Sequence, residues 1–136
     1  AIIRTADAAG VHGIVIPARR AVGLTVGVAR SSAGAVEHMK VARVANLSNA
    51  MLSLKKDKVW SVGIDPDANI DYREVDYRDA ICVVMGSEGN GMSRLVKERC
   101  DILVSIPMRG RLASLNVSVA AALVMYEAMH QRNLSM

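Results

Sequence analysis

The stretch Val84-Met85-Gly86-Ser87-Glu88-Gly89-Asn90-Gly91-Met92 joins an apolar, strand-like run to a helical pattern through a loop of glycines and polar residues. Downstream, Ser105-Ile106-Pro107-Met108 ends another apolar run, and Ser114-Leu115-Asn116-Val117-Ser118 opens the next helical pattern. Both loops therefore follow strands and lead into helices, as in sheets of parallel strands. Ligands of such sheets bind at the carboxyl ends of the strands. The two stretches together predict a cofactor site.

The order of the glycines excludes two common nucleotide sites. Gly86, Gly89 and Gly91 form the pattern GxxGxG, the reverse of the dinucleotide fingerprint, and no acidic residue follows at the required spacing. This argues against a nucleotide-dependent oxidoreductase. No Gly-Lys-Ser/Thr follows either, so a P-loop is excluded. What remains is a loop that can adopt positive φ and let a ligand approach its backbone, although a tight strand-to-helix turn would look the same.

Strand and helix patterns alternate along the whole chain. The strands are expected at Gly13–Ile16, Val41–Val44, Val59–Ile64, Ala80–Met85 and Ile102–Ile106. The helices are expected at residues 1–9, Val26–Ser32, Leu47–Lys56, Ser93–Arg99 and Leu115–His130, with Gly10 ending the first. The predicted class is therefore α/β, with a mainly parallel sheet flanked by helices.

Size and charge allow one domain with a polyanionic partner. A chain of 136 residues that is 51% hydrophobic fits a single domain with a buried core. Its formal net charge of +4 fits RNA as a partner but does not demand it. Most arginines are expected to be solvated surface charges. Arg109 and Arg111 stand out because they flank Gly110 between the two motif segments.

Several classes of protein lack support in the sequence. Cys82 and Cys100 have no His or Cys nearby at metal-ligand spacing, so we expect reduced thiols. The three histidines are isolated, which gives no support to a zinc site or a Ser/His/Asp triad. No apolar run is long enough to span a membrane, and no signal peptide is visible. We expect a cytoplasmic protein without a metal.

Three ordered motifs make the chain resemble the SpoU, or TrmH-like, RNA ribose 2′-O-methyltransferases of the SPOUT superfamily. The motifs lie at Ala1–Ala6, at Val84–Gly91, and at Ile106–Met108 with Ser114–Ala120. Ser32-Ala33-Gly34-Ala35 also resembles a loop of the branch that acts on ribosomal-RNA guanosine. The resemblance covers nearly the whole chain.

The resemblance implies a fold, a cofactor and partners. The family's α/β domain carries a deep trefoil knot near its C-terminus, and S-adenosylmethionine sits bent in that knot. Backbone groups at Gly86, Ile106, Met108 and Leu115 are then expected to hold the cofactor. Members of the family work as homodimers through the knot region and act on RNA, so both partners are expected here.

The resemblance also implies catalytic roles. Arg4 is expected to contact the target phosphate and help to activate the ribose hydroxyl, a weak acid. A guanidinium is effectively always protonated, so stabilising the phosphate and the developing alkoxide is physically easier for Arg4 than acting as a base. Glu88 is expected to orient the arginine or the substrate, while Ser114 and Asn116 position the hydroxyl and the loop.

The first motif departs from the family pattern. It normally begins with Asn and Gly just before the position of Ala1, after a strand. We therefore expect residues 1–136 to be a catalytic domain that lacks its first strand and the N-terminal RNA-binding domain of the guanosine branch. Two alternatives stay open: methylation of transfer RNA at the same ribose oxygen, and a module that binds RNA without catalysis. The presence together of Arg4, Glu88, Ser114 and Asn116 counts against the second.

Overall fold

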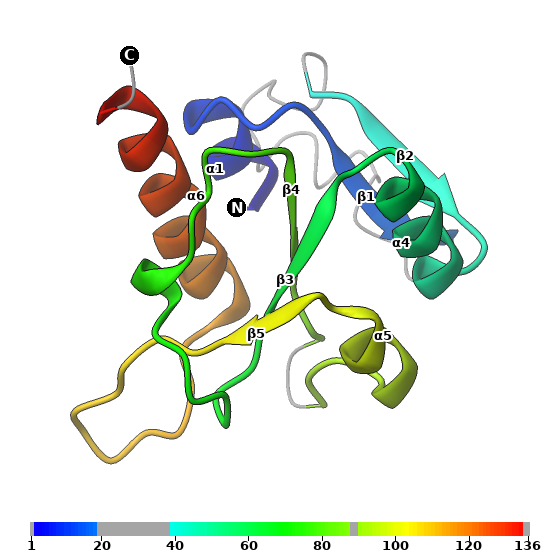
Figure 1. Ribbon diagram of the computed structural model, residues 1–136. Coiled ribbons are helices and arrows are strands. Elements are labelled where there is room, and N and C mark those ends of the chain that lie inside the picture. The colour runs from blue at the N-terminus through cyan, green and yellow to red at the C-terminus, as the bar shows by residue number, and fades with distance from the viewer. Residues whose placement is uncertain (1, 19–38, 88–89, 135–136) are drawn as a thin grey trace.

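The computed structural model describes residues 2–18, 39–87 and 90–134, and within them all paired strands run parallel (Figure 1). β1 (Ile14–Pro17) pairs with β2 (Val41–Val44). β3 (Trp60–Ile64) lies between β4 (Ile81–Val84) and β5 (Ile102–Val104). The α/β class with parallel strands is therefore confirmed.

Helices cover both sides of these strands. They are α1 (Ile2–Ala8), α4 (Leu47–Lys56), α5 (Arg94–Arg99) and α6 (Val117–Leu134), with a short 3-10 helix η2 (Tyr72–Glu74). α4 packs against β1, β3 and α5, whereas α6 packs against α1, β4 and η2. Figure 1 shows α1 and α6 on one side of the strands and α4 and α5 on the other. Within the described residues, no helix is both long and apolar enough to span a membrane.

The sequence placed most of these elements correctly. The strands β1 to β5 and the helices α1, α4 and α5 all lie where they were expected, with ends that differ by at most a few residues. The expected helix Val26–Ser32 and the loop at residues 32–35 lie outside the described residues. The sequence did not predict η2, which the Asp71 carboxylate caps by accepting a hydrogen bond from the Arg73 N–H. The trefoil knot stays a prediction.

Gly10 ends α1 as expected. Its φ of +77° lies in the left-handed region that favours glycine. The Gly10 N–H donates to the Asp7 carbonyl and the Val11 N–H donates to the Ala6 carbonyl. These two bonds form a Schellman motif, which satisfies carbonyls at the end of a helix. The turn directs the chain from α1 into β1.

The hydrophobic core has two parts, and α6 belongs to both. Ala121 and Met125 pack in one cluster with Ala6 of α1. Val124, the residue before Met125, packs with three other fully buried residues, namely Val62 of β3, Val104 of β5 and Tyr77. Side chains three or four positions apart lie on the same face of a helix. The buried face of α6 that carries Ala121, Val124 and Met125 therefore packs against both α1 and the sheet. This packing fixes the start of α6 relative to β4 and β5.

Candidate functional site

The two motif loops lie at the same edge of the three-stranded sheet. β4 and β5 both run parallel to β3, and Gly63 of β3 is in register with Val84 and Leu103. Gly86 therefore follows the carboxyl end of β4, and Ile106 follows the carboxyl end of β5. This edge is where parallel sheets bind ligands. The structure places both loops as the sequence predicted.

The loop after β4 closes on itself. Ser87 and Gly91 exchange two backbone hydrogen bonds of 3.1 and 2.9 Å, and Gly91 has a φ of +67°. A Cβ atom on Gly86 would lie 2.3 Å from the carbonyl carbon of Gly91 and 2.4 Å from the nitrogen of Met92. The sequence predicted a loop that can adopt positive φ, as Gly91 does, and that lets a ligand approach its backbone, which stays a prediction. On the side of Gly86 where a side chain would lie, the backbone of the loop itself fills the space. Glu88 and Gly89 lie outside the described residues.

The four expected cofactor-binding positions have main-chain groups without partners among the described residues. Gly86, Ile106, Met108 and Leu115 are all half-buried. Their N–H and C=O groups form no hydrogen bond with any residue that the structure describes. Backbone groups removed from water are nearly always paired in folded proteins. These positions therefore offer donors and acceptors to a bound molecule at this edge of the sheet.

The start of α6 differs from the prediction. The helix begins at Val117, and the Asn116 side-chain oxygen accepts hydrogen bonds from the N–H and the hydroxyl of Ser118. Asn116 therefore caps the helix, because an amide oxygen so close to the first turn reaches its free donors. Ser114 is exposed and makes no hydrogen bond within the described part of the chain. Its hydroxyl is available to another molecule.

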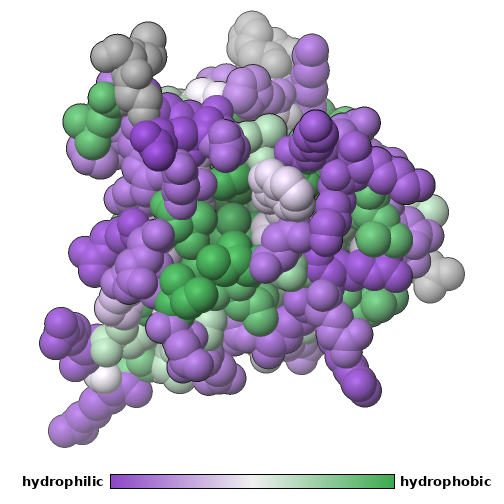
Figure 2. Space-filling view, viewed as in Figure 1, coloured by the Kyte–Doolittle hydropathy of each residue, from purple (hydrophilic) through white to green (hydrophobic). Residues whose placement is uncertain are grey.

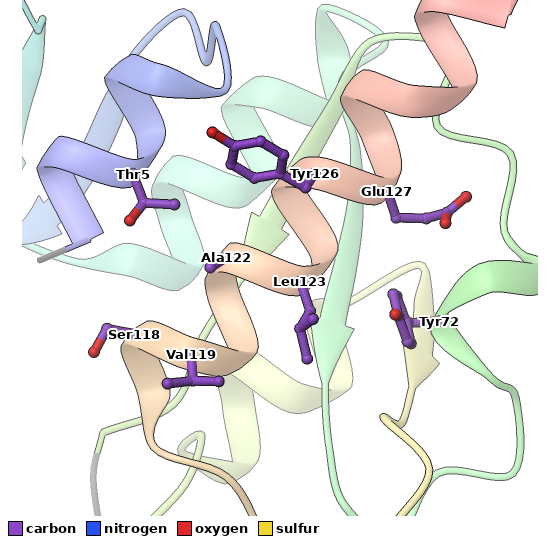
Figure 3. A pocket seen from close by; sticks show the side chains of 8 residues that line it. All are labelled: Thr5, Tyr72, Ser118, Val119, Ala122, Leu123, Tyr126 and Glu127. Carbon is purple, nitrogen blue, oxygen red and sulfur yellow. The ribbon is translucent and has the colours of Figure 1, made fainter.

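Arg4 lies on α1, which packs beside α6. It is exposed and forms no ion pair with a described residue. Its neighbour Thr5 lines an open hollow of about 640 Å³ together with Ser118 from the first turn of α6 (Figure 3). The fold thus brings the helix of Arg4 next to the turn that Asn116 caps. These residues are far apart in the sequence.

An ion pair that the sequence analysis missed supports this edge of the sheet. Asp65 follows β3, is only 7% exposed, and lies with Oδ2 2.7 Å from Nζ of Lys97 on α5. Its other oxygen accepts the Asp67 N–H. The hydrogen bond from Lys97, with that from Asp67, holds the pKa of Asp65 below its ordinary value of 3.8. The pair ties the end of the central strand to the helix that follows the glycine loop.

Replacing Lys97 by glutamine is expected to cost about 1–3 kcal/mol of folding free energy at pH 7, because a buried carboxylate loses its charged partner. A lowered pKa stabilises the fold above pH 3.8, and this contribution is lost as the pH falls through the lower pKa of the folded state. The difference between wild type and variant should therefore shrink below pH 3.8. Urea unfolding at pH 7 and pH 3 measures it.

Arg94→Gln is the matched control for this experiment. It removes one charge from the same helix, but the Arg94–Glu98 pair is exposed and such pairs contribute little. We expect a change below about 0.5 kcal/mol. An equal loss in both variants, or a loss in Lys97→Gln that persists at pH 3, would contradict the account of Asp65.

The two cysteines, Cys82 and Cys100, have no catalytic or metal-binding role in the proposed site. Both are free thiols, as expected. Burial raises the pKa of Cys82, and it raises the pKa of Cys100 to about 11. Thiols that stay protonated at neutral pH are poor nucleophiles. Among the described residues, no group of three or more His, Cys, Asp or Glu side chains is placed to hold a metal ion.

Comparison with known proteins relates this geometry to a family. The chain is 55% identical over 132 residues to YacO of Bacillus subtilis, which is named for the TrmH family of tRNA/rRNA methyltransferases. A protein of Staphylococcus saprophyticus with the same family name is 53% identical over 132 residues. Each alignment includes 97% of this chain and 53% of the relative. The chain thus spans about half the length of the curated relatives it matches.

Solved structures share the fold. The SpoU methyltransferase AviRb from Streptomyces viridochromogenes, in complex with the cofactor AdoMet, matches with a TM-score of 0.90 and 32% identity, over 98% of this chain and 55% of AviRb. The TrmH/SpoU tRNA modifying enzyme of A. aeolicus matches with a TM-score of 0.88 and 31% identity, over 98% of this chain and 68% of that one. The sequence model of the SpoU rRNA Methylase family matches residues 1–126. Since that match covers most of the chain, including both loops at the carboxyl edge, the chain belongs to the SpoU rRNA Methylase family.

Proposed function

We propose that this chain is the catalytic domain of an S-adenosylmethionine-dependent RNA methyltransferase, which methylates a ribose 2′-hydroxyl of a guanosine in large-subunit ribosomal RNA. One observation carries the proposal. Gly86, Ile106, Met108 and Leu115 are half-buried residues at the edge where ligands of parallel sheets bind, and their main-chain groups have no partners among the described residues. A structural relative over 98% of the chain, AviRb, has AdoMet bound.

The site has the chemical groups that this cofactor requires. Adenine and ribose present donors and acceptors, which free N–H and C=O groups can match. The bound sulfonium supplies an already activated methyl group. The protein therefore needs to align the ribose hydroxyl and to stabilise the charge that develops on its oxygen. Half-buried loops also keep part of the bulk water away from the reacting atoms.

The proposed catalytic residues have different roles in aligning the ribose hydroxyl and stabilising the charge on its oxygen. Arg4 is exposed without a carboxylate partner among the described residues, so its guanidinium is available to the target phosphate and the developing alkoxide. Asn116 is held by Ser118 at the start of α6, which fixes its position. Ser114 offers an exposed hydroxyl near the same turn. Glu88 is proposed to orient the arginine or the substrate.

The experiment is transfer of tritium from the methyl group of S-adenosylmethionine to unmodified ribosomal RNA and to transfer RNA. A ribose 2′-O-methyl group blocks alkaline cleavage of the next phosphodiester bond. We expect the label in alkali-resistant dinucleotides that begin with guanosine, from ribosomal RNA. Label on a base, or no label in either RNA, would contradict the proposal.

Transfer RNA is the second candidate substrate. The relative in A. aeolicus is a tRNA modifying enzyme, and the names of the most similar relatives mention both RNAs. The same assay distinguishes the two, because each RNA is supplied separately. Label in transfer RNA alone would favour this candidate over ribosomal RNA.

A homodimer through the proposed knot region is part of the proposal. Val119, Leu123 and Tyr126 leave large apolar surfaces exposed along one face of α6. They line the open hollow with Thr5 and Tyr72 (Figure 3). Hydrophilic residues cover most of the side of the molecule that Figure 2 shows, so exposed apolar side chains are the exception on this surface. Patches of this kind mark interaction surfaces, and a second copy of the chain is the proposed occupant.

Leu123→Lys is expected to weaken the dimer about 30-fold or more, since a charge replaces an apolar contact. Leu52→Lys is the matched control: Leu52 is 41% exposed and Leu123 38%, but Leu52 lies on α4, across the strands. Sedimentation equilibrium should show dimers for the wild type and for Leu52→Lys, and monomers for Leu123→Lys at the same concentration. A wild type that stays monomeric, or equal weakening by both variants, would contradict this interface.

A further inference from the structure

The arginines of the described residues fall into two groups. The first group is already engaged by ion pairs or by hydrogen bonds to main-chain carbonyls, and its members are Arg73, Arg78, Arg94, Arg99 and Arg132. The second group has no such partner among described residues, and its members are Arg4, Arg43, Arg109 and Arg111. Two of these four, Arg109 and Arg111, share one loop.

That loop, residues 105–116, projects from the fold. Figure 1 shows it extending away from the sheet between β5 and α6. A Cβ atom added to Gly110 would have no atom within 4 Å, and Leu112 is 74% exposed. Arg109 and Arg111 are exposed as well. The tip of the loop therefore packs against nothing in the described part of the chain.

The charge on the loop is not neutralised by its sequence surroundings. No aspartate or glutamate occurs from Ile102 to Tyr126. Arg73 and Arg78, by contrast, each bind an aspartate two positions earlier. Two guanidinium groups without nearby carboxylates produce a positive potential that attracts a polyanion. Arginine also forms paired hydrogen bonds with phosphate, so the chemistry favours a phosphate ligand.

The position of the loop relates this charge to the proposed site. Arg109 directly follows Met108, and the loop then leads to Ser114 and Leu115. Residues two positions apart are separated by at most about 7 Å, and arginine side chains reach further, so both guanidinium groups can contact neighbouring phosphates of one strand. A strand held by both arginines would therefore pass beside the residues proposed for methyl transfer.

We propose that Arg109 and Arg111 bind two consecutive phosphates of the substrate RNA and so set the register in which the target ribose enters the site. That the polyanion is the substrate RNA rests on the proposed function. Phosphate contacts position a nucleic acid without reading its sequence. The two arginines are thus positioning residues, and the choice of nucleotide belongs to other groups.

The test measures binding of a fluorescein-labelled, single-stranded 12-nucleotide RNA of mixed sequence by fluorescence anisotropy over a range of KCl concentrations. Each phosphate contact to a single strand contributes about 0.7 to the slope of log affinity against log salt. The double variant Arg109→Gln/Arg111→Gln should therefore lower the magnitude of the slope by about 1.4. It should also weaken binding about 10- to 30-fold at 0.1 M salt.

The double variant Arg73→Gln/Arg78→Gln is the matched control, because it removes the same charge from arginines that aspartates already neutralise. It should leave the slope unchanged. The inference is overturned if the loop variant binds like the wild type, if both double variants lose the same affinity, or if the wild type does not bind the RNA. Calorimetric titration of the wild type with S-adenosylmethionine is run in parallel, because absence of that binding refutes the proposed function without changing the result for the arginines.

Discussion

Replacing Arg4 by alanine is expected to lower the rate of methyl transfer to RNA by about 100-fold or more, the usual effect of removing a group that stabilises charge in a transition state. Deprotonation of the ribose hydroxyl creates negative charge next to a phosphate. A guanidinium without a partner among the described residues can stabilise both. The change should leave folding intact because Arg4 is exposed.

Arg43→Ala is the matched control for Arg4→Ala. Arg43 is also exposed and has no ion pair with the described residues, but it lies on β2 rather than beside α6. The rate of tritium transfer should fall by about 100-fold or more only in Arg4→Ala, while the affinity for S-adenosylmethionine measured by calorimetry stays close to wild type in both. Transfer at the wild-type rate by Arg4→Ala would refute the catalytic role.

Gly86→Ala is expected to weaken S-adenosylmethionine binding about 100-fold, since small misplacements of a binding group have effects of this size. The new Cβ atom would lie 2.3 Å from a backbone carbon of Gly91, a distance that real structures do not tolerate. The loop that Ser87 and Gly91 close would have to open. Overpacking of this kind also costs about 1–3 kcal/mol of stability.

Gly110→Ala separates this effect from a general intolerance of loop substitutions. A Cβ atom on Gly110 meets no atom within 4 Å. The Gly110→Ala variant should have the melting temperature and the cofactor affinity of the wild type, whereas both should be lower in Gly86→Ala. Cofactor affinity that survives in Gly86→Ala would show that the closed shape of the loop is not needed for binding.

Local patterns in the sequence predicted the elements well. The strand Val41–Val44 and the helix Leu47–Lys56 have the bounds that hydrophobic periodicity indicated. Gly10 ends α1 with positive φ because a residue without a Cβ atom reaches that conformation at little cost. Such features depend on residues a few positions apart. They can therefore be predicted from the sequence alone, without knowing the tertiary fold.

Contacts over long distances were not predictable in the same way. The sequence analysis did not single out Asp65, because its partner Lys97 lies on a helix beyond the next strand. The crowding around Gly86 was not predicted for a related cause, because the backbone that approaches it returns only after the loop has turned. The cap of α6 was not predicted either, because Ser114 and Asn116 are both residue types that cap helices and only the structure shows that Asn116 does so.

The cofactor-binding residues remain a prediction of a different kind. The side chains of Ile106, Met108 and Leu115 carry no strongly polar group, so the residue types alone indicate no ligand. Only the family resemblance singled them out. The structure adds a physical property to these positions, because the residues are half-buried and their main-chain groups lack partners among the described residues.

Isothermal titration of the wild-type chain with S-adenosylmethionine tests the central claim most directly. The account predicts saturable binding of one molecule per chain, with competition by S-adenosylhomocysteine and no saturable heat from NAD or ATP at the same concentrations. Absence of saturable heat with S-adenosylmethionine, from a chain that is folded by circular dichroism, would contradict it.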